Sequence, residues 1–580
     1  MTITEALKVM QGAPRDGRRF CVTLACGFTP LHLHTFLTAH LQQALPDRKV
    51  SISTGLYGNL AGTLEGIAGS APDGVVIALE WADLDPRLDF RSAGGWGWNA
   101  ASDIVSSARA VLDRVSSAVV VIPSGVRIAL SLPTLPLPPA FHTPGWEASA
   151  HELVLEADLL RFASNMAQNG RVIVGNRLRL SEESPAAARF DLKSDLYTGL
   201  PYTIQHADRV ASQIALAMVP PAPKKGIISD LDDTLWRGVA GEVGPEGILW
   251  DLASHAHLHG LYQKLLSSLS EHGTLVGIAS KNDPAVVAKA FDRRDLLLRP
   301  EQLFPIEVHW NAKSGSVSRI LETWNIAADS VIFVDDSPME LAEVAAGHPG
   351  IECILFPKND YAAGLAMLQR LRDLCGKERV STDDTLRLKS IREGAAFREQ
   401  VAGAATPETF LAQAEATVTF DFGSASEPRV LELVNKTNQF NLNGRRYTES
   451  DWRSLVAKPN SLVVSVSYED KFGPLGTIAV LGGAIHGDVF AAETWVMSCR
   501  AFTRRIEHQA LKILFETTGA RAIDFDFAPT ARNGLFQEFF TALLGEKPVG
   551  KFQLGRAQFD EKCPALYHMV REMKRAEAHG

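Results

Sequence analysis

Cysteine, long apolar runs and an excess of basic residues are all scarce or missing in this sequence. The 580 residues include six cysteines, which form no CxxC pair. This usage argues against a disulfide framework and a thiolate zinc site, and it favours a reducing, cytoplasmic location. No stretch supplies the ~20 uninterrupted apolar residues of a membrane span, and residues 1–20 lack the apolar core of a secretory signal. We therefore expect no membrane partner.

The charge balance excludes a further class of function. Lys and Arg number 58 against 67 Asp and Glu, a formal net charge of -9. Binding to a phosphate backbone needs a basic excess, so nucleic acid is not expected as a partner. A composition of 46% hydrophobic and 22% charged residues is that of a globular protein. At ~100–200 residues per domain, the length predicts three to four domains.

Two stretches divide the chain into three blocks. Residues 220–225 (PPAPKK) form a proline-rich spacer, and residues 377–406 indicate a polar, charged helix that ends near Gly403 and Pro407. The first two blocks alternate short apolar runs with helical patterns, which predicts α/β folds with parallel sheets. The third block mixes longer strands with helices, an α+β pattern. The predicted divisions are residues 1–222, 223–378, a linker helix at 379–405, and 406–580.

Two carboxylates follow the first predicted strand of the middle block. Asp230 and Asp232 come directly after the apolar run GIIS, and their i, i+2 spacing directs both side chains to the same side. Mg²⁺ takes few carboxylates and keeps waters and phosphate oxygens as its other ligands, so the pair suits that ion. The alternative is that the two aspartates cap the next helix.

Further polar side chains occur at the ends of later apolar runs in the same block. Ligands bind at the carboxyl ends of strands in open α/β sheets, so we expect these side chains to meet the aspartate pair. In chain order they are Ser280, Lys281 and Asn282 after one strand, a lone lysine, Lys313, and Asp335 and Asp336 after another.

This order of acid, hydroxyl, lysine and acid resembles the haloacid dehalogenase (HAD) superfamily over roughly residues 224–357. The resemblance implies a Rossmann-like parallel sheet in which Asp230 is the nucleophile that accepts a phosphoryl group. It implies that Asp232 is the general acid and base and that Lys313 stabilises the phosphoryl oxygens. The implied Mg²⁺ ligands are Asp230, Asp232, Asp335 and Asp336, and the implied phosphate or substrate contacts are Thr234, Ser280, Lys281 and Asn282.

The spacing of these motifs leaves no room for a large cap domain. Only a short Gly-rich flap, residues 237–247, follows the aspartate pair. An uncapped site admits a macromolecular substrate, and a partner must then help to exclude water.

A narrower resemblance covers roughly residues 224–580. The stretches DLDDTLWRGVAGEVGPEGI, SKNDP, HWNAKS and FVDDSPMELAEV, together with TNQFN and SCR in the third block, are similar to FkbH-type proteins (subfamily IIIC phosphatases) of polyketide and related pathways. The third block is correspondingly similar to the GNAT acyltransferase fold. The resemblance implies that a glyceryl unit from 1,3-bisphosphoglycerate moves to a protein thiol and then to the phosphopantetheine of an acyl carrier protein, while phosphate is removed at Asp230.

Cys499, in the SCR stretch, is the candidate thiol. The neighbouring Arg500 would lower the pKa of this thiol and favour the nucleophilic thiolate. The alternative is a buried, inert cysteine, and the sequence leaves both interpretations open.

Other polar residues of the third block are candidates for the acyl or carrier site. Arg504 and Arg505 stand where the family has a glycine-bearing turn, and they would contact a phosphopantetheine phosphate or an acidic carrier protein. The asparagine-rich stretch would line the acyl site or, alternatively, form a satisfied turn network; its polar residues are Asn435, Thr437, Asn438 and Asn441.

The first block resembles the SGNH-hydrolase-like domain found on some of these proteins. That family needs a serine nucleophile after its first strand, and here the strand is followed by Cys26 and Gly27. Asp195 and His206 are candidate relics of the family's last motif. We therefore expect a non-catalytic docking or scaffolding role.

Three functions remain open from the sequence. The first is Mg²⁺-dependent dephosphorylation coupled to loading of a three-carbon unit onto an acyl carrier protein. The second is a plain phosphatase of a small metabolite or phosphoprotein. The third is a non-enzymatic assembly protein that retains the HAD fold for binding.

Overall fold

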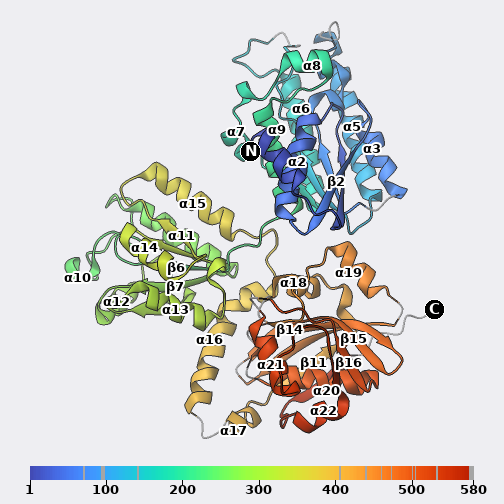
Figure 1. Cartoon of the computed structure of the whole chain (residues 1–580). Coiled ribbons are helices and arrows are strands. Elements are labelled where there is room, and N and C mark those ends of the chain that lie inside the picture. The colour runs from blue at the N-terminus through green and yellow to red at the C-terminus, as the bar shows by residue number, and fades with distance from the viewer. Residues whose placement is uncertain are drawn as a thin grey trace. The chain divides into compact units, whose positions relative to one another are not determined.

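The protein comprises two compact units, shown by a computed structural model (Figure 1). The first unit is Met1–Pro221 with Thr448–Ser450, and the second is Ala222–Tyr447 with Asp451–Gly580. Three sheets, two of them parallel and one mixed, confirm the predicted multi-domain α/β class. The structure describes residues 1–69, 72–92, 98–139, 143–403, 407–437, 440–458, 460–471, 473–498, 501–502, 504–530 and 533–573.

The first unit is built on a five-stranded parallel sheet in the order β2-β1-β3-β4-β5. Its strands are β1 (Arg18–Ala25), β2 (Arg48–Thr54), β3 (Gly74–Ala78), β4 (Arg127–Ser131) and β5 (Val172–Val174). Its helices are α1 (Ile3–Gln11), α2 (Leu31–Ala44), α3 (Leu60–Glu65), α4 (Trp81–Leu84), α5 (Ala101–Val121), α6 (Ala150–Gln168), α7 (Arg177–Glu183), α8 (Leu192–Thr198) and α9 (Ile204–Met218).

The central strand β3 explains why this sheet is covered on both faces. All five of its residues are buried. Val75 and Ile77 belong to a core with α3, α5 and α6, whereas Val76 and Ala78 belong to a core with α2 and α9. Alternate residues of a strand point to opposite faces, so a continuously apolar strand requires helices on both sides.

The second unit begins with another five-stranded parallel sheet, in the order β10-β9-β6-β7-β8. The strands are β6 (Gly226–Ser229), β7 (Leu275–Ser280), β8 (Leu303–Val308), β9 (Val331–Asp335) and β10 (Glu352–Leu355). The helices are α10 (Ala240–Val243), α11 (His257–Glu271), α12 (Pro284–Phe291), α13 (Lys313–Trp324), α14 (Pro338–Gly347) and α15 (Tyr361–Cys375).

The predicted flap is a short loop over the end of β6. Arg237 and Leu249 exchange backbone hydrogen bonds of 2.8 and 3.1 Å, which closes the base of the loop around α10. Between β6 and β7 the chain forms only α10 and α11, and between β7 and β8 only α12 and one 3₁₀ turn. Residues 143–403 are all described, and this part of the chain holds no separate cap.

The rest of the second unit surrounds a mixed eight-stranded sheet. Its main path runs β17-β16-β15-β14-β13-β11-β18, with β12 paired to β15. The strands are β11 (Thr417–Asp421), β12 (Phe440–Asn441), β13 (Ser461–Asp470), β14 (Gly473–His486), β15 (Val489–Met497), β16 (Ala522–Phe525), β17 (Phe552–Gly555) and β18 (Met569–Met573). The helices are α17 (Pro407–Ala412), α18 (Pro428–Lys436), α19 (Glu449–Val456), α20 (Ile506–Thr518), α21 (Gly534–Leu544) and α22 (Arg556–Lys562).

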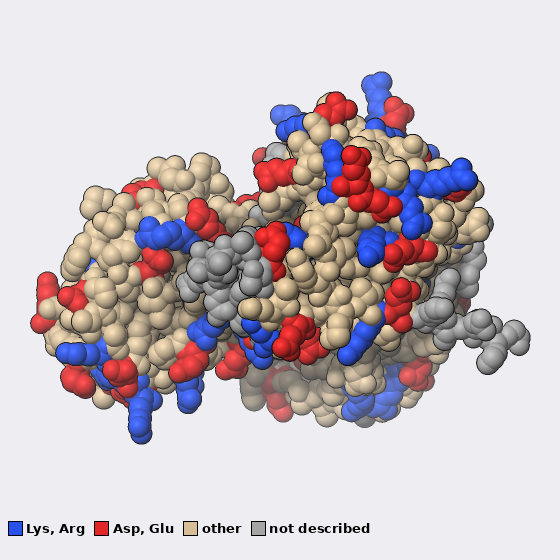
Figure 2. Space-filling model, turned by 90° about the horizontal axis from the view of Figure 1, so that it is seen from below, with Lys and Arg blue, Asp and Glu red and all other residues tan. Residues whose placement is uncertain are grey.

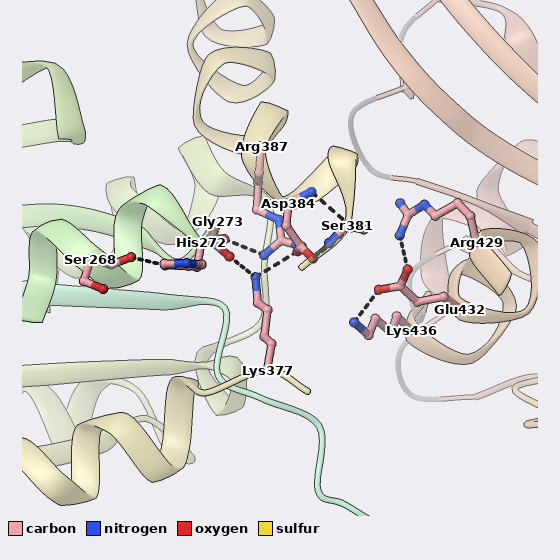
Figure 3. A network of polar contacts seen from close by, with 10 residues as sticks. All are labelled: Ser268, His272, Gly273, Lys377, Ser381, Asp384, Arg387, Arg429, Glu432 and Lys436. Atoms are coloured by element: carbon pink, nitrogen blue, oxygen red, sulfur yellow. Dashed lines mark hydrogen bonds and ion pairs between the residues drawn. The ribbon is translucent and has the colours of Figure 1, made fainter. Parts of the chain in front are cut away.

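The long polar helix α16 (Thr382–Gly403) connects the two sheets of the second unit. Its first turn carries Asp384, which is 1% exposed and accepts hydrogen bonds from Lys377 Nζ at 2.8 Å and an Arg387 side-chain nitrogen at 2.7 Å (Figure 3). The same two cations donate to the carbonyls of His272 and Gly273, in the turn between α11 and β7. The network therefore fastens α16 to the parallel sheet.

Gly273 is required at this junction. Its φ is +83°, and a Cβ there would lie 2.3 Å from the carbonyl oxygen of Asp384. Both the left-handed backbone and the close approach exclude a larger residue.

The surface carries charges of both signs. On the face shown in Figure 2, Lys and Arg are interspersed with Asp and Glu. Among the described residues, no helix is both long and apolar enough to cross a membrane.

We predict that Asp384→Asn lowers the free energy of unfolding of the second unit by about 3 kcal/mol at pH 7, because it leaves two cations without their buried carboxylate. Burial opposes ionisation, but the hydrogen bond from Lys377 and the charge of Arg387 hold the pKa of Asp384 well below its usual range. The stabilisation should be complete above the unfolded pKa of about 4 and decline as the pH falls below it. Urea unfolding followed by circular dichroism at pH 7, 4 and 3 measures this.

The matched control is Glu322→Gln, an exposed carboxylate on α13 of the same unit. A difference below about 1 kcal/mol between Asp384→Asn and this control at pH 7 would contradict the assigned role.

Candidate active site

The candidate site lies where β6 and β9 end side by side. The chain runs from β6 outward through β7 and β8, then returns to form β9 and β10 on the other side. Ligands bind at such a reversal of strand order, beyond the carboxyl ends of the strands. A hollow of about 200 Å³ is present there. It is lined by Asp230, Asp232, Asp233, Val239, Ser280, Lys281, Lys313, Asp335, Asp336, Ser337 and Glu340.

A buried lysine joins the two strand ends. Lys313, the first residue of α13, places Nζ 2.9 Å from Asp230 Oδ1 and 2.6 Å from Asp335 Oδ2. The exposed fractions are 4% for Lys313, 5% for Asp230 and 0% for Asp335. Charges this far from water are stable only when paired, so the three groups constrain one another.

Burial and the two ion pairs shift the pKa values of this cluster. Burial raises the pKa of Asp230, and the charge of Lys313 opposes that rise. Burial also raises the pKa of Asp335, to about 6, and Asp230 adds to the rise. Burial lowers the pKa of Lys313, but the two carboxylates outweigh it and keep that pKa above its usual value. Lys313 is therefore charged at neutral pH.

Three carboxylates converge on one point of the hollow. Asp230, Asp335 and Asp336 each offer an oxygen, and these atoms lie within 4.8 Å of one another. A cluster of hard oxygen donors with room for further ligands fits a small divalent cation such as Mg²⁺. Asp232 was predicted as a fourth metal ligand, but its carboxylate is not part of this group.

Asp232 is instead held by three hydrogen-bond donors. Oδ1 accepts from Trp236 Nε1 at 2.9 Å and from the backbone N–H of Ala240 at 3.1 Å. Oδ2 accepts from Asn282 Nδ2 at 2.8 Å. Burial raises the pKa of Asp232 despite these bonds, and the charge of Asp230 contributes to the rise. A positioned carboxyl with a raised pKa suits proton transfer better than metal ligation.

Sequence reasoning missed a second lysine of the site. Lys358 Nζ lies 2.8 Å from Asp336 Oδ2 and 2.9 Å from Asp233 Oδ2. Hydrogen bonds to both carboxylates raise the pKa of Lys358 to about 12. Asp233 has a φ of +52° and also accepts from the backbone N–H of Gly238 at 2.8 Å, which ties the flap to the site. The sequence could have pointed to Lys358 as a site residue, because it follows the end of the strand ECIL (β10) by three residues.

Two predicted substrate contacts do not line the hollow. Thr234 is fully buried; its carbonyl oxygen lies 2.9 Å from His259 Nδ1, and its hydroxyl has no hydrogen-bond partner. Asn282 is 2% exposed and binds Asp232. Ser280 and Lys281 do line the hollow, and Lys281 Nζ pairs with Glu340 at 2.9 Å.

In the third block, Asn438, Cys499 and Arg500 lie outside the described residues. Arg504 is 4% exposed, with its guanidinium 5.4 Å from the Tyr468 ring centroid, so it is not the surface docking residue predicted from the sequence. Arg505 pairs with Glu408.

Two described asparagines of the asparagine-rich stretch, Asn435 and Asn441, hold turns of the backbone. Asn435 exchanges two hydrogen bonds of 2.8 Å with the backbone of Tyr447. Asn441 Oδ1 accepts from the backbone of Asn443 and Gly444 at 3.1 and 2.7 Å. These two asparagines therefore follow the turn-network alternative.

The residue at the predicted nucleophile position of the first unit is buried. Cys26 is 4% exposed, and burial raises the pKa of its thiol to about 12. His206 is fully buried between the hydroxyls of Thr134 and Ser184, at 2.8 and 2.9 Å, and burial lowers its pKa to about 3. Burial therefore disfavours the thiolate of Cys26 and the charged form of His206.

No protein-family model matches the chain, and no curated protein matches it. The chain is similar to the crystal structure of the N-terminal part of protein BF1531 from Bacteroides fragilis, which contains a phosphatase domain complexed with Mg. The sequence identity is 18% and the TM-score 0.51, over 65% of this chain and 100% of that one. This likeness shows a shared fold. An uncharacterized protein from Corynebacterium glutamicum aligns with a TM-score of only 0.19 at 11% identity, over 27% of this chain and 98% of that one.

We predict that Lys313→Met destabilises the second unit by about 3–5 kcal/mol, because it leaves Asp230 and Asp335 buried without a cation. Adding Asp335→Asn should recover part of that loss by removing one of the two uncompensated charges. Urea unfolding of both single variants and the double variant measures the coupling. Lys289→Met, an exposed lysine on α12, is the control. Additive effects of Lys313→Met and Asp335→Asn would contradict the ion cluster.

Proposed function

We propose that the second unit is a Mg²⁺-dependent phosphatase with Asp230 as its nucleophile. The main observation behind this proposal is the position of Asp230. Its carboxylate lies against the ammonium of Lys313 and within 4.8 Å of oxygens from Asp335 and Asp336. A nucleophile beside a cation and a divalent-metal donor set is the arrangement that phosphoryl transfer needs, because charge stabilisation dominates that reaction. The fold shared with a Mg-bound phosphatase domain supports it.

The first step would transfer the phosphoryl group to Asp230. A carboxylate oxygen of Asp230 forms a bond to phosphorus while the bond to the leaving oxygen breaks. Asp232 donates a proton to that leaving oxygen, a role that its raised pKa supports. Lys313 and the hydroxyl of Ser280 would hold phosphoryl oxygens. Mg²⁺, when bound by Asp230, Asp335 and Asp336, would offset the negative charge of the phosphoryl group.

The second step would release phosphate. Asp232, now deprotonated, takes a proton from a water molecule, whose oxygen attacks phosphorus. The bond between phosphorus and Asp230 breaks, which restores the carboxylate and frees inorganic phosphate. Asn282 and Trp236 keep Asp232 in place for both proton transfers.

We predict that the protein releases phosphate from acetyl phosphate or p-nitrophenyl phosphate only with Mg²⁺, and that EDTA abolishes the release. Asp230→Asn should lower the rate by at least about 10³-fold, since it removes the nucleophile. Asp232→Asn should lower it by about 10²–10⁴-fold. A malachite green assay measures the phosphate, with Glu322→Gln as the control.

Two results would count against the phosphatase. Unchanged activity in Asp230→Asn would remove Asp230 from the reaction. Absence of any Mg²⁺-dependent release would favour the non-enzymatic assembly protein, in which the site only binds.

The finer proposal is that the protein loads a glyceryl unit onto an acyl carrier protein. In this scheme the substrate is 1,3-bisphosphoglycerate: the Cys499 thiolate attacks the acyl carbon as the C1 phosphate leaves, and the acyl group then passes to a phosphopantetheine thiol, which frees Cys499. The phosphate ester at C3 is hydrolysed at Asp230, with the C3 oxygen as the leaving oxygen. The support is the FkbH-type motifs of the sequence, among them the SCR stretch that contains Cys499. A plain phosphatase of a small metabolite or phosphoprotein is the competing function.

We predict a glyceryl adduct on a holo acyl carrier protein after incubation with the enzyme, Mg²⁺ and 1,3-bisphosphoglycerate. Intact-protein mass spectrometry should also detect the adduct on the enzyme, and Cys499→Ser should abolish both adducts. Cys563→Ser, another cysteine of the same block, is the matched control. Phosphate release without any adduct would leave the plain phosphatase.

A further inference from the structure

The first unit contains a pocket at the carboxyl ends of its own parallel strands. The pocket lies where the strand order reverses between β1 and β3, the position at which open α/β sheets bind ligands. Gly27 follows β1 and Glu80 follows β3, and both line it. The cavity volume is about 50 Å³. An apolar cavity of about 150 Å³ holds benzene, so this pocket takes only the end of a small molecule.

Two carboxylates of the pocket accept hydrogen bonds from the protein itself. Glu80 is 3% exposed and accepts hydrogen bonds from the hydroxyls of Thr134 and Tyr202, both at 2.6 Å, and from the backbone of Leu135 at 3.2 Å. Asp83 Oδ2 accepts from the backbone N–H of Glu80 at 2.8 Å. These two carboxylates are therefore already satisfied by the protein.

Asp195 differs from the other buried carboxylates of this unit. Asp208 pairs with His40 at 2.8 Å, and Asp158 pairs with Arg109 at 2.6 Å. Asp195, on α8, is 6% exposed and lines the pocket, yet its carboxylate has no hydrogen bond or ion pair to any residue that the structure describes. Its oxygens are not among the fully buried polar atoms that lack a partner, so they face the open space of the pocket, where a ligand with an N–H group can reach them.

The acidic residues that line the pocket favour a cationic ligand. Four acidic residues line the pocket, and no Lys, Arg or His is among its described lining residues. Burial raises the pKa of Glu80, and it raises the pKa of Asp83 to about 7, so these two add less negative charge than their number suggests. The charge of Arg91 lowers the pKa of Asp195, but Arg91 donates a hydrogen bond to the hydroxyl of Tyr57. Burial and the charge of Asp89 nevertheless raise the pKa of Asp195 to about 6.

The aromatic side chains of the pocket favour a ligand that carries an apolar group next to its cation. Five aromatic side chains line the pocket: Phe28, Tyr57, Trp81, Phe90 and Phe190. Aromatic faces attract ammonium groups and contact alkyl chains. A bare metal ion fits less well, because these carboxylates do not form an oxygen cluster like that of Asp230, Asp335 and Asp336.

We propose that this pocket binds the ammonium end of a small primary alkylamine, with Asp195 accepting an N–H hydrogen bond and the aromatic walls contacting the first methylenes. The site is one of binding rather than catalysis, since burial disfavours the thiolate of Cys26 and the charged form of His206.

Calorimetry on the full chain at pH 8 tests the proposal with n-butylamine, 1-butanol and tetramethylammonium. We expect saturable binding of n-butylamine, at least about 10-fold weaker binding of 1-butanol, which lacks the charge, and weaker binding of tetramethylammonium than of n-butylamine, since it keeps the attraction to the aromatic walls but lacks an N–H donor. Asp195→Asn should weaken the binding of n-butylamine at least about 10-fold. Asp113→Asn, an exposed carboxylate on α5, should leave it unchanged.

Three results would overturn the proposal: no binding of n-butylamine, equal binding of 1-butanol, or equal affinity of Asp195→Asn and the unaltered protein. Asp195→Asn should melt no lower than the unaltered protein, because it removes an unpaired buried charge. If that variant does not fold, the proposal is tested by whether the unaltered protein binds n-butylamine more tightly than 1-butanol. Phosphatase activity plays no part in this test.

Discussion

The buried ammonium of Lys313 holds together the chemistry of the second unit. It begins α13 and pairs with carboxylates at the ends of β6 and β9, two strands that are neighbours in space but far apart in the chain. Removing three charges from water costs several kcal/mol per ion, and close pairing offsets that cost. The position of each group therefore depends on the other two. The outer partners, Asp232 and Lys358, are arranged around this centre.

Two parallel sheets of this chain place a hollow at the same topological position, yet the chemistry differs. At the end of β6, lysines balance much of the acidic charge, and three carboxylates remain close enough to share a divalent cation. At the end of β3, the lining is acidic and aromatic, and Asp195 has no described partner for its carboxylate. The sheet supplies the location, and the side chains of the following loops decide what is bound.

Several polar residues of the second unit serve its architecture rather than a ligand. Asp384 and its two cations fasten the linker helix to the turn before β7. Arg504 packs over Tyr468 inside the third block, and Asn441 closes a turn. In each case a charged or amide side chain satisfies buried partners, which is the usual fate of buried polar groups.

The sequence alone predicted the α/β class, because strand periodicity is a local property of the chain. It also predicted that Asp230, Lys313, Asp335 and Asp336 lie at the same edge of one sheet, because each follows or adjoins the end of a predicted strand. Thr234, Asn282 and Arg504 are buried, which nearness along the chain does not reveal. Lys358 and the unpartnered carboxylate of Asp195 came only from the tertiary structure. Their significance depends on contacts between segments more than 100 residues apart, such as Lys358 with Asp233, and on what the surrounding chain leaves unsatisfied.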